Sequence, residues 1–176
     1  MNPQPDAVAD NIAFLRQGVA LVERLSADAF TGASGLCPGG TVGSHVRHCL
    51  DFYVSFLDGV GTGRIDYDDR RRDAELETVP ARALQVFGEV AGRLETIRAA
   101  DREAALLVRG DGSAQGEGAW TRSSIGRELQ FLLSHTIHHF ALIGFMLRAT
   151  GLEVDALFGV APSTLRHWEN TGARAS

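Results

Sequence analysis

Two short segments of the chain concentrate histidines at helical spacings. Residues 45–48 read HVRH and residues 135–139 read HTIHH. Together they hold five of the six histidines: His45, His48, His135, His138 and His139. At about 100° per residue, His135 and His139 lie on one face of a helix, one turn apart. Because both rings reach a common point, such a pair can chelate one metal ion.

A third ligand for such an ion has to come from a facing helix, and the other segment offers His45 and His48. His138 points away from the pair, toward the rim of its helix. A single histidine at the edge of an apolar face is more often a hydrogen-bonded core residue than a ligand. The clustering on two helices, more than the spacing of either motif, therefore indicates a metal site.

Other catalytic signatures are absent from the sequence. No glutamate has a histidine three residues later, as a di-iron carboxylate bundle requires. There is no HExxH, GxSxG or GxGxxG motif either. All 17 basic residues are arginine. Without lysine, Schiff-base chemistry, a phosphate-loop lysine and a lysine general base are excluded.

The composition is that of one folded domain. Of 176 residues, 44% are hydrophobic and 22% charged, and the net charge of −5 fits nucleic-acid binding poorly. The two cysteines form no CxxC pair, and the sequence shows no signal peptide and no membrane-length apolar run. We therefore expect a cytoplasmic protein without nucleic-acid or membrane partners. Its single domain spans residues 1–176, with a core over roughly 6–150 and an extension over 151–176.

Apolar side chains recur at steps of three and four in four segments, which predicts four amphipathic helices. These segments are residues 6–25, 41–57, 80–97 and 124–150. Each opens with a residue suited to a helix start: Asp6, Thr41, Pro80, and Ser123 or Ser124. This pattern favours an all-α four-helix bundle, whose two long connections allow crossovers.

The connections are predicted to be largely irregular. We expect a Gly-rich loop over residues 26–40 and an exposed, charge-balanced loop over residues 64–80. The stretch 106–121 has a Gly-rich centre flanked by β-compatible residues, which allows a short hairpin. A short C-terminal helix over residues 162–169 would let Trp168 dock on the body of the domain.

With these motifs the chain resembles the DinB-like family of bacterial metal-binding four-helix bundles. The second predicted helix matches the family motif at five positions: Thr41, Val42, Val46, His48 and Asp51. The fourth predicted helix matches it in the HTIHH segment, and the resemblance covers roughly residues 6–150. It implies one divalent metal ion, with zinc or nickel the leading candidates, and three ligands: His48, His135 and His139.

Periodicity and resemblance differ on the ligand from the second helix. On a helical wheel, His45 lies nearer the centre of the apolar stripe than His48 does, so periodicity favours His45. The family motif favours His48 instead. In that case His45 is a candidate for an outer position, from which it orients a ligand or faces the substrate.

Four further residues are candidates for orienting or substrate-binding groups around the metal: Asp51, Tyr67, Arg70 and His138. Asp51, one turn after His48, could accept a ligand N–H, although its place equally fits an exposed helix carboxylate. An arginine of the 66–73 loop could bind the carboxylate of an anionic thiol. The simpler interpretation of this loop is a solvated segment with balanced charges.

Members of the family include thiol S-transferases that use low-molecular-weight thiols, and others that look like hydrolases. The resemblance therefore implies a metal-dependent enzyme that acts on a small molecule, such as a low-molecular-weight thiol, through a metal-bound thiolate or water. Three imidazoles leave open coordination positions, and this suits both reactions. The alternative is a non-catalytic metal-binding or stress-response module.

Many family members pair through their helices, so the resemblance also implies a homodimer. The fourth predicted helix has apolar residues beyond its main stripe: Leu133, Phe140, Leu142 and Phe145. Large exposed apolar surfaces usually mark interfaces. Either a partner subunit or the C-terminal tail around Trp168 would cover this surface.

Overall fold

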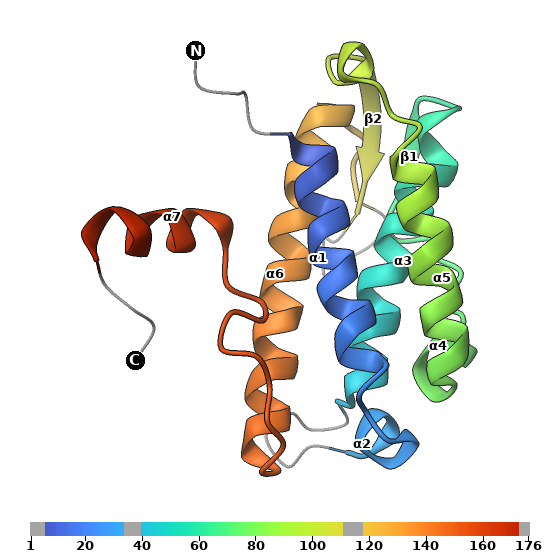
Figure 1. The fold of residues 1–176 in the computed structure, drawn as a ribbon. Coiled ribbons are helices and arrows are strands. Elements are labelled where there is room, and N and C mark those ends of the chain that lie inside the picture. The colour runs from blue at the N-terminus through green and yellow to red at the C-terminus, as the bar shows by residue number, and fades with distance from the viewer. Residues whose placement is uncertain (1–5, 34–39, 111–117, 173–176) are drawn as a thin grey trace.

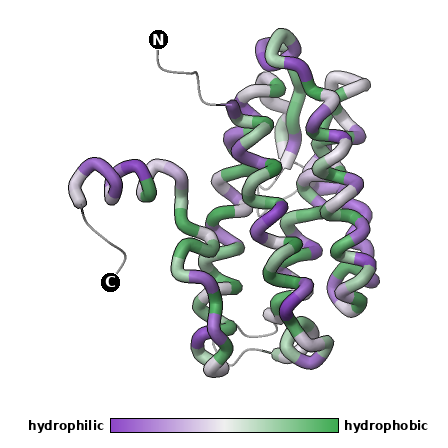
Figure 2. Tube along the Cα trace, in the orientation of Figure 1, coloured by the Kyte–Doolittle hydropathy of each residue, from purple (hydrophilic) through white to green (hydrophobic). Residues whose placement is uncertain are grey.

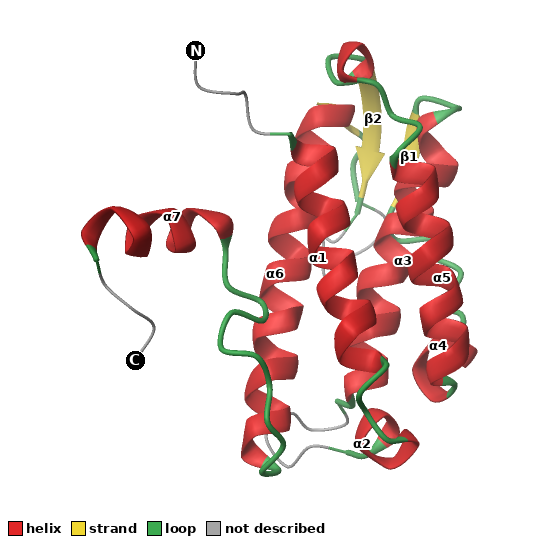
Figure 3. Cartoon of the chain, viewed as in Figure 1, coloured by secondary structure: helices red, strands yellow, loops and turns green. Residues whose placement is uncertain are grey.

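The computed structural model describes residues 6–33, 40–110 and 118–172, and it shows a bundle of four long helices (Figures 1 and 3). These are α1 (Ala7–Val22), α3 (Val42–Val60), α5 (Pro80–Leu94) and α6 (Ile125–Ala149). Both α1 and α3 pack against α5 and α6. Helices α3 and α5 run in the same direction, opposite to α1 and α6, so the chain returns along the bundle between α3 and α5 (Figure 1).

The four bundle helices begin where the sequence predicts. The side chains of Asp6 and Ser124 accept hydrogen bonds from first-turn N–H groups of α1 and α6. Thr41 and Ser44 form a reciprocal capping box at the start of α3, and Pro80 opens α5. The caps satisfy donors that the first turn of a helix leaves unpaired, and proline at the first position has no such donor.

The apolar faces of the helices meet in one core. Figure 2 shows hydrophobic and hydrophilic residues alternating along each bundle helix. Several of the largest fully buried side chains are aromatic: Phe30, Phe52, Tyr53, Phe56, Phe87 and Phe140. Cys49 is also buried, and burial raises the pKa of its thiol. This cysteine is therefore a packing residue and not a nucleophile.

The expectation of an all-α fold is wrong, because a three-stranded sheet lies at one end of the bundle (Figure 3). The strands are β1 (Arg64–Asp66), β2 (Ala105–Arg109) and β3 (Thr121–Ser124). Strands β2 and β3 pair antiparallel as the expected hairpin, although part of its connection, 111–117, lies outside the described residues. Strand β1 pairs parallel to β2. With only three residues, β1 is too short for its sequence to show a strand period.

Two segments expected to be loops contain helices and buried residues. Residues 64–80 are not an exposed loop, because Ile65, Tyr67 and Leu76 are buried and α4 (Glu75–Thr78) forms within them. Residues 27–31 form α2 (Ala27–Thr31), which buries Phe30 completely. Helices of four or five residues are too short to show a helical period, so tertiary contacts decide their structure.

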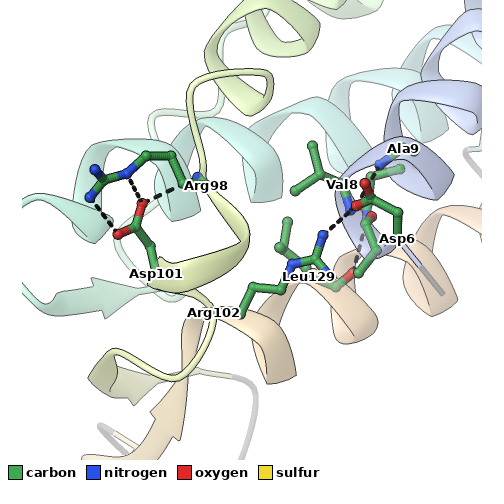
Figure 4. A network of polar contacts seen from close by, with 9 residues as sticks. Asp6, Val8, Ala9, Arg98, Asp101, Arg102 and Leu129 are labelled. Carbon is green, nitrogen blue, oxygen red and sulfur yellow. Dashed lines mark hydrogen bonds and ion pairs between the residues drawn. The ribbon is translucent and has the colours of Figure 1, made fainter. Parts of the chain in front are cut away.

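An ion pair ties the connection after α5 to the start of α1. This connection contains a short 3₁₀ helix, η1 (Ala99–Asp101). Arg98, the residue before η1, donates two side-chain hydrogen bonds to Asp101 (Figure 4). The next residue, Arg102, pairs with Asp6, the cap of α1 (Figure 4). The backbone carbonyl of Arg102 also accepts a 2.8 Å hydrogen bond from the N–H of Gly126 in α6.

The C-terminal segment folds back onto α6 before it leaves the bundle. Phe158 stacks on Phe140 with ring centroids 4.9 Å apart, so the extra apolar surface expected around Phe140 is covered within the chain. The predicted short helix is present as α7 (Pro162–Thr171), and it projects away from the bundle (Figure 1). Trp168 on α7 is only partly buried, and α7 contains no buried residue.

We expect Gly43→Ala to destabilise the fold by roughly 1–3 kcal/mol, because the new methyl group has no space. A Cβ at Gly43 would lie 2.0 Å from the carbonyl oxygen of Glu77 in α4 and 2.8 Å from the Phe30 ring. The matched control is Gly88→Ala in α5, where the added Cβ meets nothing within 4 Å. We expect it to stabilise the fold by about 0.4–1 kcal/mol. Urea unfolding measures the free energy of unfolding of both variants. A free energy of unfolding for Gly43→Ala equal to that of the wild type would contradict the close packing of α4 on α3.

Candidate metal centre

Three histidines from two helices form a group whose geometry suits one metal ion. His48 of α3 and His135 and His139 of α6 offer nitrogen atoms that all lie within 4.8 Å of one another. Their ring centroids are 4.5–4.9 Å apart, and all three side chains are half-buried. Small movements of the three side chains would bring their nitrogen atoms to the distances found for imidazoles that bind one ion.

The packing of α3 against α6 brings the three histidines together. His135 and His139 are one turn apart on α6, and His48 approaches them from α3. Thr136, the neighbour of His135, donates a 3.1 Å hydrogen bond to the Tyr53 hydroxyl of α3. Both partners are buried, so this bond fixes the two helices relative to each other beside the histidines.

His45 lies next to the group and contacts one of its members. Its Nδ1 atom is 2.8 Å from Nδ1 of His139, so one of the two nitrogens donates and the other accepts. That bond leaves Nε2 of His139 available to a metal. The structure therefore places His48, the choice from the family motif, inside the group. His45, the choice from periodicity, lies in an outer position.

The local environment favours the neutral form of His139 and of His45. Burial, together with the nearby rings of His135, His48, His45 and His138, lowers the pKa of His139 to about 3. Burial and the neighbouring His138 also lower the pKa of His45. Neutral imidazole is the form that binds a metal ion, so His139 needs no deprotonation at neutral pH before binding.

An aromatic wall borders the group on the side of His135. The ring of Phe52 lies 4.4 Å from His135 and 5.0 Å from His48. Phe131 lies 5.6 Å from His135, and Tyr67 contacts both phenylalanines at 5.0–5.5 Å. Neither Phe52 nor Phe131 was among the residues predicted for the site. Both are four residues from a histidine on the same helix, and this spacing could have indicated them.

Tyr67 belongs to the wall, but its hydroxyl group is engaged elsewhere. The hydroxyl donates a 2.9 Å hydrogen bond to Glu128, which also accepts a 2.5 Å hydrogen bond from Ser123. Burial, the charge of Glu128 and this hydrogen bond raise the pKa of Tyr67. Glu128 is itself buried, so the contact anchors the 64–80 segment to α6. A buried carboxylate with two donors has a structural role, so we assign that role to Glu128.

Asp51 is buried, unlike an exposed helix carboxylate. Only 6% of it is exposed, and burial raises its pKa, an effect opposed by Arg47 and Arg70. Asp73 of the 64–80 segment is near enough to influence the same pKa. Asp51 of α3 is therefore buried against that segment.

The two remaining candidates lie at the edge of the site. Arg70 extends over the ring of Phe52, with its guanidinium carbon 4.2 Å from the ring centroid. His138 is exposed at the rim of α6, as predicted, and its ring lies 5.1 Å from that of His139.

Comparisons with known proteins leave the family of the chain open. No family model matches it. A stretch of 46 residues is 50% identical to part of FK506-binding protein 5 from Rhizopus delemar. The match covers 26% of this chain and 12% of that protein, which is too little to show a family. Within the described ranges, no helix is long and apolar enough to cross a membrane.

We expect the purified protein to bind about one divalent ion per chain, and His48→Ala and His135→Ala each to lose most of it. Removing one of three ligands leaves too few to hold the ion. His138→Ala is the matched control, because it removes an exposed imidazole from the same helix as His135. Elemental analysis after gel filtration measures the metal content of each variant.

The same measurement separates a ligand from an orienting residue. We expect His45→Ala to keep the site but to weaken metal affinity by about 10–100-fold, as is typical when an outer hydrogen-bonding partner is removed. Retention of full metal content by His48→Ala, with its loss in His45→Ala, would reverse the two roles.

Proposed function

We propose that the chain is a DinB-like, divalent-metal-dependent enzyme that acts on a small molecule by thiol S-transfer or hydrolysis. The observation that carries the proposal is the convergence of His48, His135 and His139 from two helices. Within the described residues, no carboxylate or cysteine belongs to this group. A site with three protein ligands and an open position is the usual form of a catalytic metal site.

Zinc or nickel suits this set of ligands best. Neutral imidazoles are good ligands for both ions, whereas magnesium and calcium prefer oxygen atoms. A divalent ion held by the three histidines would act as a Lewis acid and lower the pKa of a water molecule or thiol bound to it.

The surrounding residues supply position and a restricted solvent environment. His45 holds the ring of His139 through their Nδ1 contact, which sets the nitrogen that His139 presents. Phe52 and Phe131 cover the His135 side with apolar rings. Low water content beside the group strengthens its electrostatic interactions with a bound substrate.

A screen of the metal-loaded protein tests the proposed activity. We expect acceleration either of thiol conjugation to small electrophiles or of ester or amide hydrolysis. His135→Ala should lower the rate by at least about 100-fold, because a catalytic metal ion typically stabilises the transition state by several kcal/mol. His138→Ala should retain the wild-type rate. No acceleration of either reaction by the metal-loaded protein would favour the non-catalytic metal-binding or stress-response alternative.

We further propose that the protein is a cytoplasmic homodimer. Phe145 of α6 is 64% exposed, and Leu152 and Leu157 in the following segment are 40% and 47% exposed. Leu152 and Leu157 line one pocket. Exposed apolar surface favours an interface, and symmetric dimers are the commonest soluble oligomers. Light scattering at micromolar concentration should give twice the chain mass of 18.9 kDa. A mass equal to that of one chain would contradict the dimer.

A further inference from the structure

Helix α7 carries an apolar face but has no buried residue. It projects away from the bundle (Figure 1). Leu165 and Trp168 lie one turn apart on one face of α7, and both are only partly buried. A helix of ten residues is marginally stable in water by itself, and helices of this length are usually stabilised by packing of an apolar face. The face with Leu165 and Trp168 therefore needs a surface to pack against.

A pocket lies between the end of α1 and the segment that follows α6, and its volume is about 450 Å³. Most of the side chains that line it are apolar, among them Ala20, Leu21, Leu25, Leu152, Leu157 and Phe158. Along α1 the pocket runs from Gln17 to the turn at Arg24, which is about two helical turns or roughly 11 Å. This length accommodates Leu165 and Trp168, which are one turn apart.

The charges on α7 complement the charges that line this pocket. Within the described residues, Arg24 of the pocket has no carboxylate partner, and neither Arg166 nor Glu169 of α7 forms an ion pair. The pocket also contains Glu153 and Asp155. Glu169 can therefore pair with Arg24, and Arg166 with one of the two acidic residues. Pairs of this kind at the edge of a contact contribute specificity more than affinity.

The link into α7 directs this helix away from the pocket of its own chain. The N–H of Gly159 donates a 3.2 Å hydrogen bond to the Gln17 side chain. Gly159 has a φ of +72°, and a Cβ at this position would lie 2.8 Å from backbone atoms of Phe140 and Ala141. Only residues 160 and 161 separate this fixed point from α7. So short a link keeps α7 in the direction seen in Figure 1.

Helix α7 and the pocket thus form two complementary surfaces that a single chain does not join. We propose that α7 of each chain binds the pocket of a second copy, so that two chains exchange their C-terminal helices. A two-fold dimer makes this contact twice, because each copy supplies both surfaces. The contact also covers Leu152 and Leu157, which are 40% and 47% exposed. The inference rests on the proposed homodimer and identifies its interface.

Light scattering of the full-length chain over a range of concentrations tests this interface. Wild-type protein should give twice the chain mass of 18.9 kDa. Trp168→Ala should raise the dissociation constant of the dimer by at least about 100-fold, because both copies of a central aromatic side chain are lost. The matched control is His167→Ala, which removes an exposed ring from another face of α7 and should leave the dissociation constant unchanged. Circular dichroism should show an intact bundle in both variants, since α7 has no buried residue.

A second variant blocks the pocket and leaves α7 unchanged. Ala20 is an exposed residue of the pocket, so Ala20→Arg fills space there without entering the core. It should weaken the dimer as Trp168→Ala does. The control is Ala13→Arg, an exposed position about two turns earlier on the same face of α1 and outside the pocket, which should leave the dimer intact.

Mixing the two variants tests whether the helices are exchanged between chains. In a mixture, the intact α7 of the Ala20→Arg chain can bind the intact pocket of the Trp168→Ala chain. We therefore expect mixed dimers at concentrations at which neither variant dimerises alone.

Fluorescence of Trp168 reports the position of α7 directly. The chain has two tryptophans, so Trp120→Phe leaves Trp168 as the single emitter. Its emission should move to shorter wavelength as the concentration rises and the dimer forms, because its ring then leaves water.

The possible failures of the inference and of the proposed homodimer are distinguishable. A wild-type mass equal to that of one chain would overturn both. A dimer that survives either Trp168→Ala or Ala20→Arg has another interface, which would overturn this inference alone. Emission at short wavelength from a monomer, unchanged with concentration, would show that α7 packs within its own chain and would also overturn the exchange.

Discussion

A chain of buried hydrogen bonds between three helices sets the geometry on which the histidine site depends. The Asn11 side chain of α1 donates to the carbonyl of Leu129 in α6 at 3.0 Å and accepts from the Tyr53 hydroxyl of α3 at 2.6 Å. Thr136 of α6 completes the chain by donating to Tyr53. Apolar faces tolerate repacking, whereas a shift that unpairs one buried polar group costs about 1–3 kcal/mol. The network therefore selects one register of α3 against α6, and with it the position of His135.

The histidine cluster is the place where the bundle departs from a simple apolar core. His48, His135 and His139 lie within ring-contact distance of one another, and His45 contacts His139, so protonation of one ring would disfavour that of its neighbours. Such a group contributes less to folding than apolar residues of the same size would. Departures of this kind are expected at functional sites. A metal ion that binds the folded state and not the unfolded state would stabilise the fold, so metal binding and folding are linked.

Local signals made the bundle predictable, and long-range contacts account for what the sequence did not show. Helical periodicity with capping residues such as Asp6 and Thr41 predicted all four bundle helices, and the spacing of His135 and His139 predicted half of the site. Strand β1 and helices α2 and α4 are too short to have a period, and they form because residues such as Ile65 and Phe30 reach the core. The helical wheel favoured His45 because it treats α3 alone. Which face of α3 meets His139 depends on its packing against α6.

The elements that break the all-α pattern also complete the surroundings of the site. Strand β1 and helix α4 both pack on α3, so the segment between them is held beside Phe52. Tyr67 enters the aromatic wall from this segment, and its hydroxyl group is fixed by Glu128 of α6. Asp51 of α3 is buried close to the same segment. A plain four-helix bundle would have the histidines, Phe52 and Phe131, but not Tyr67 or Arg70. The small sheet and α4 therefore complete the aromatic wall and add a cation beside the three-histidine group.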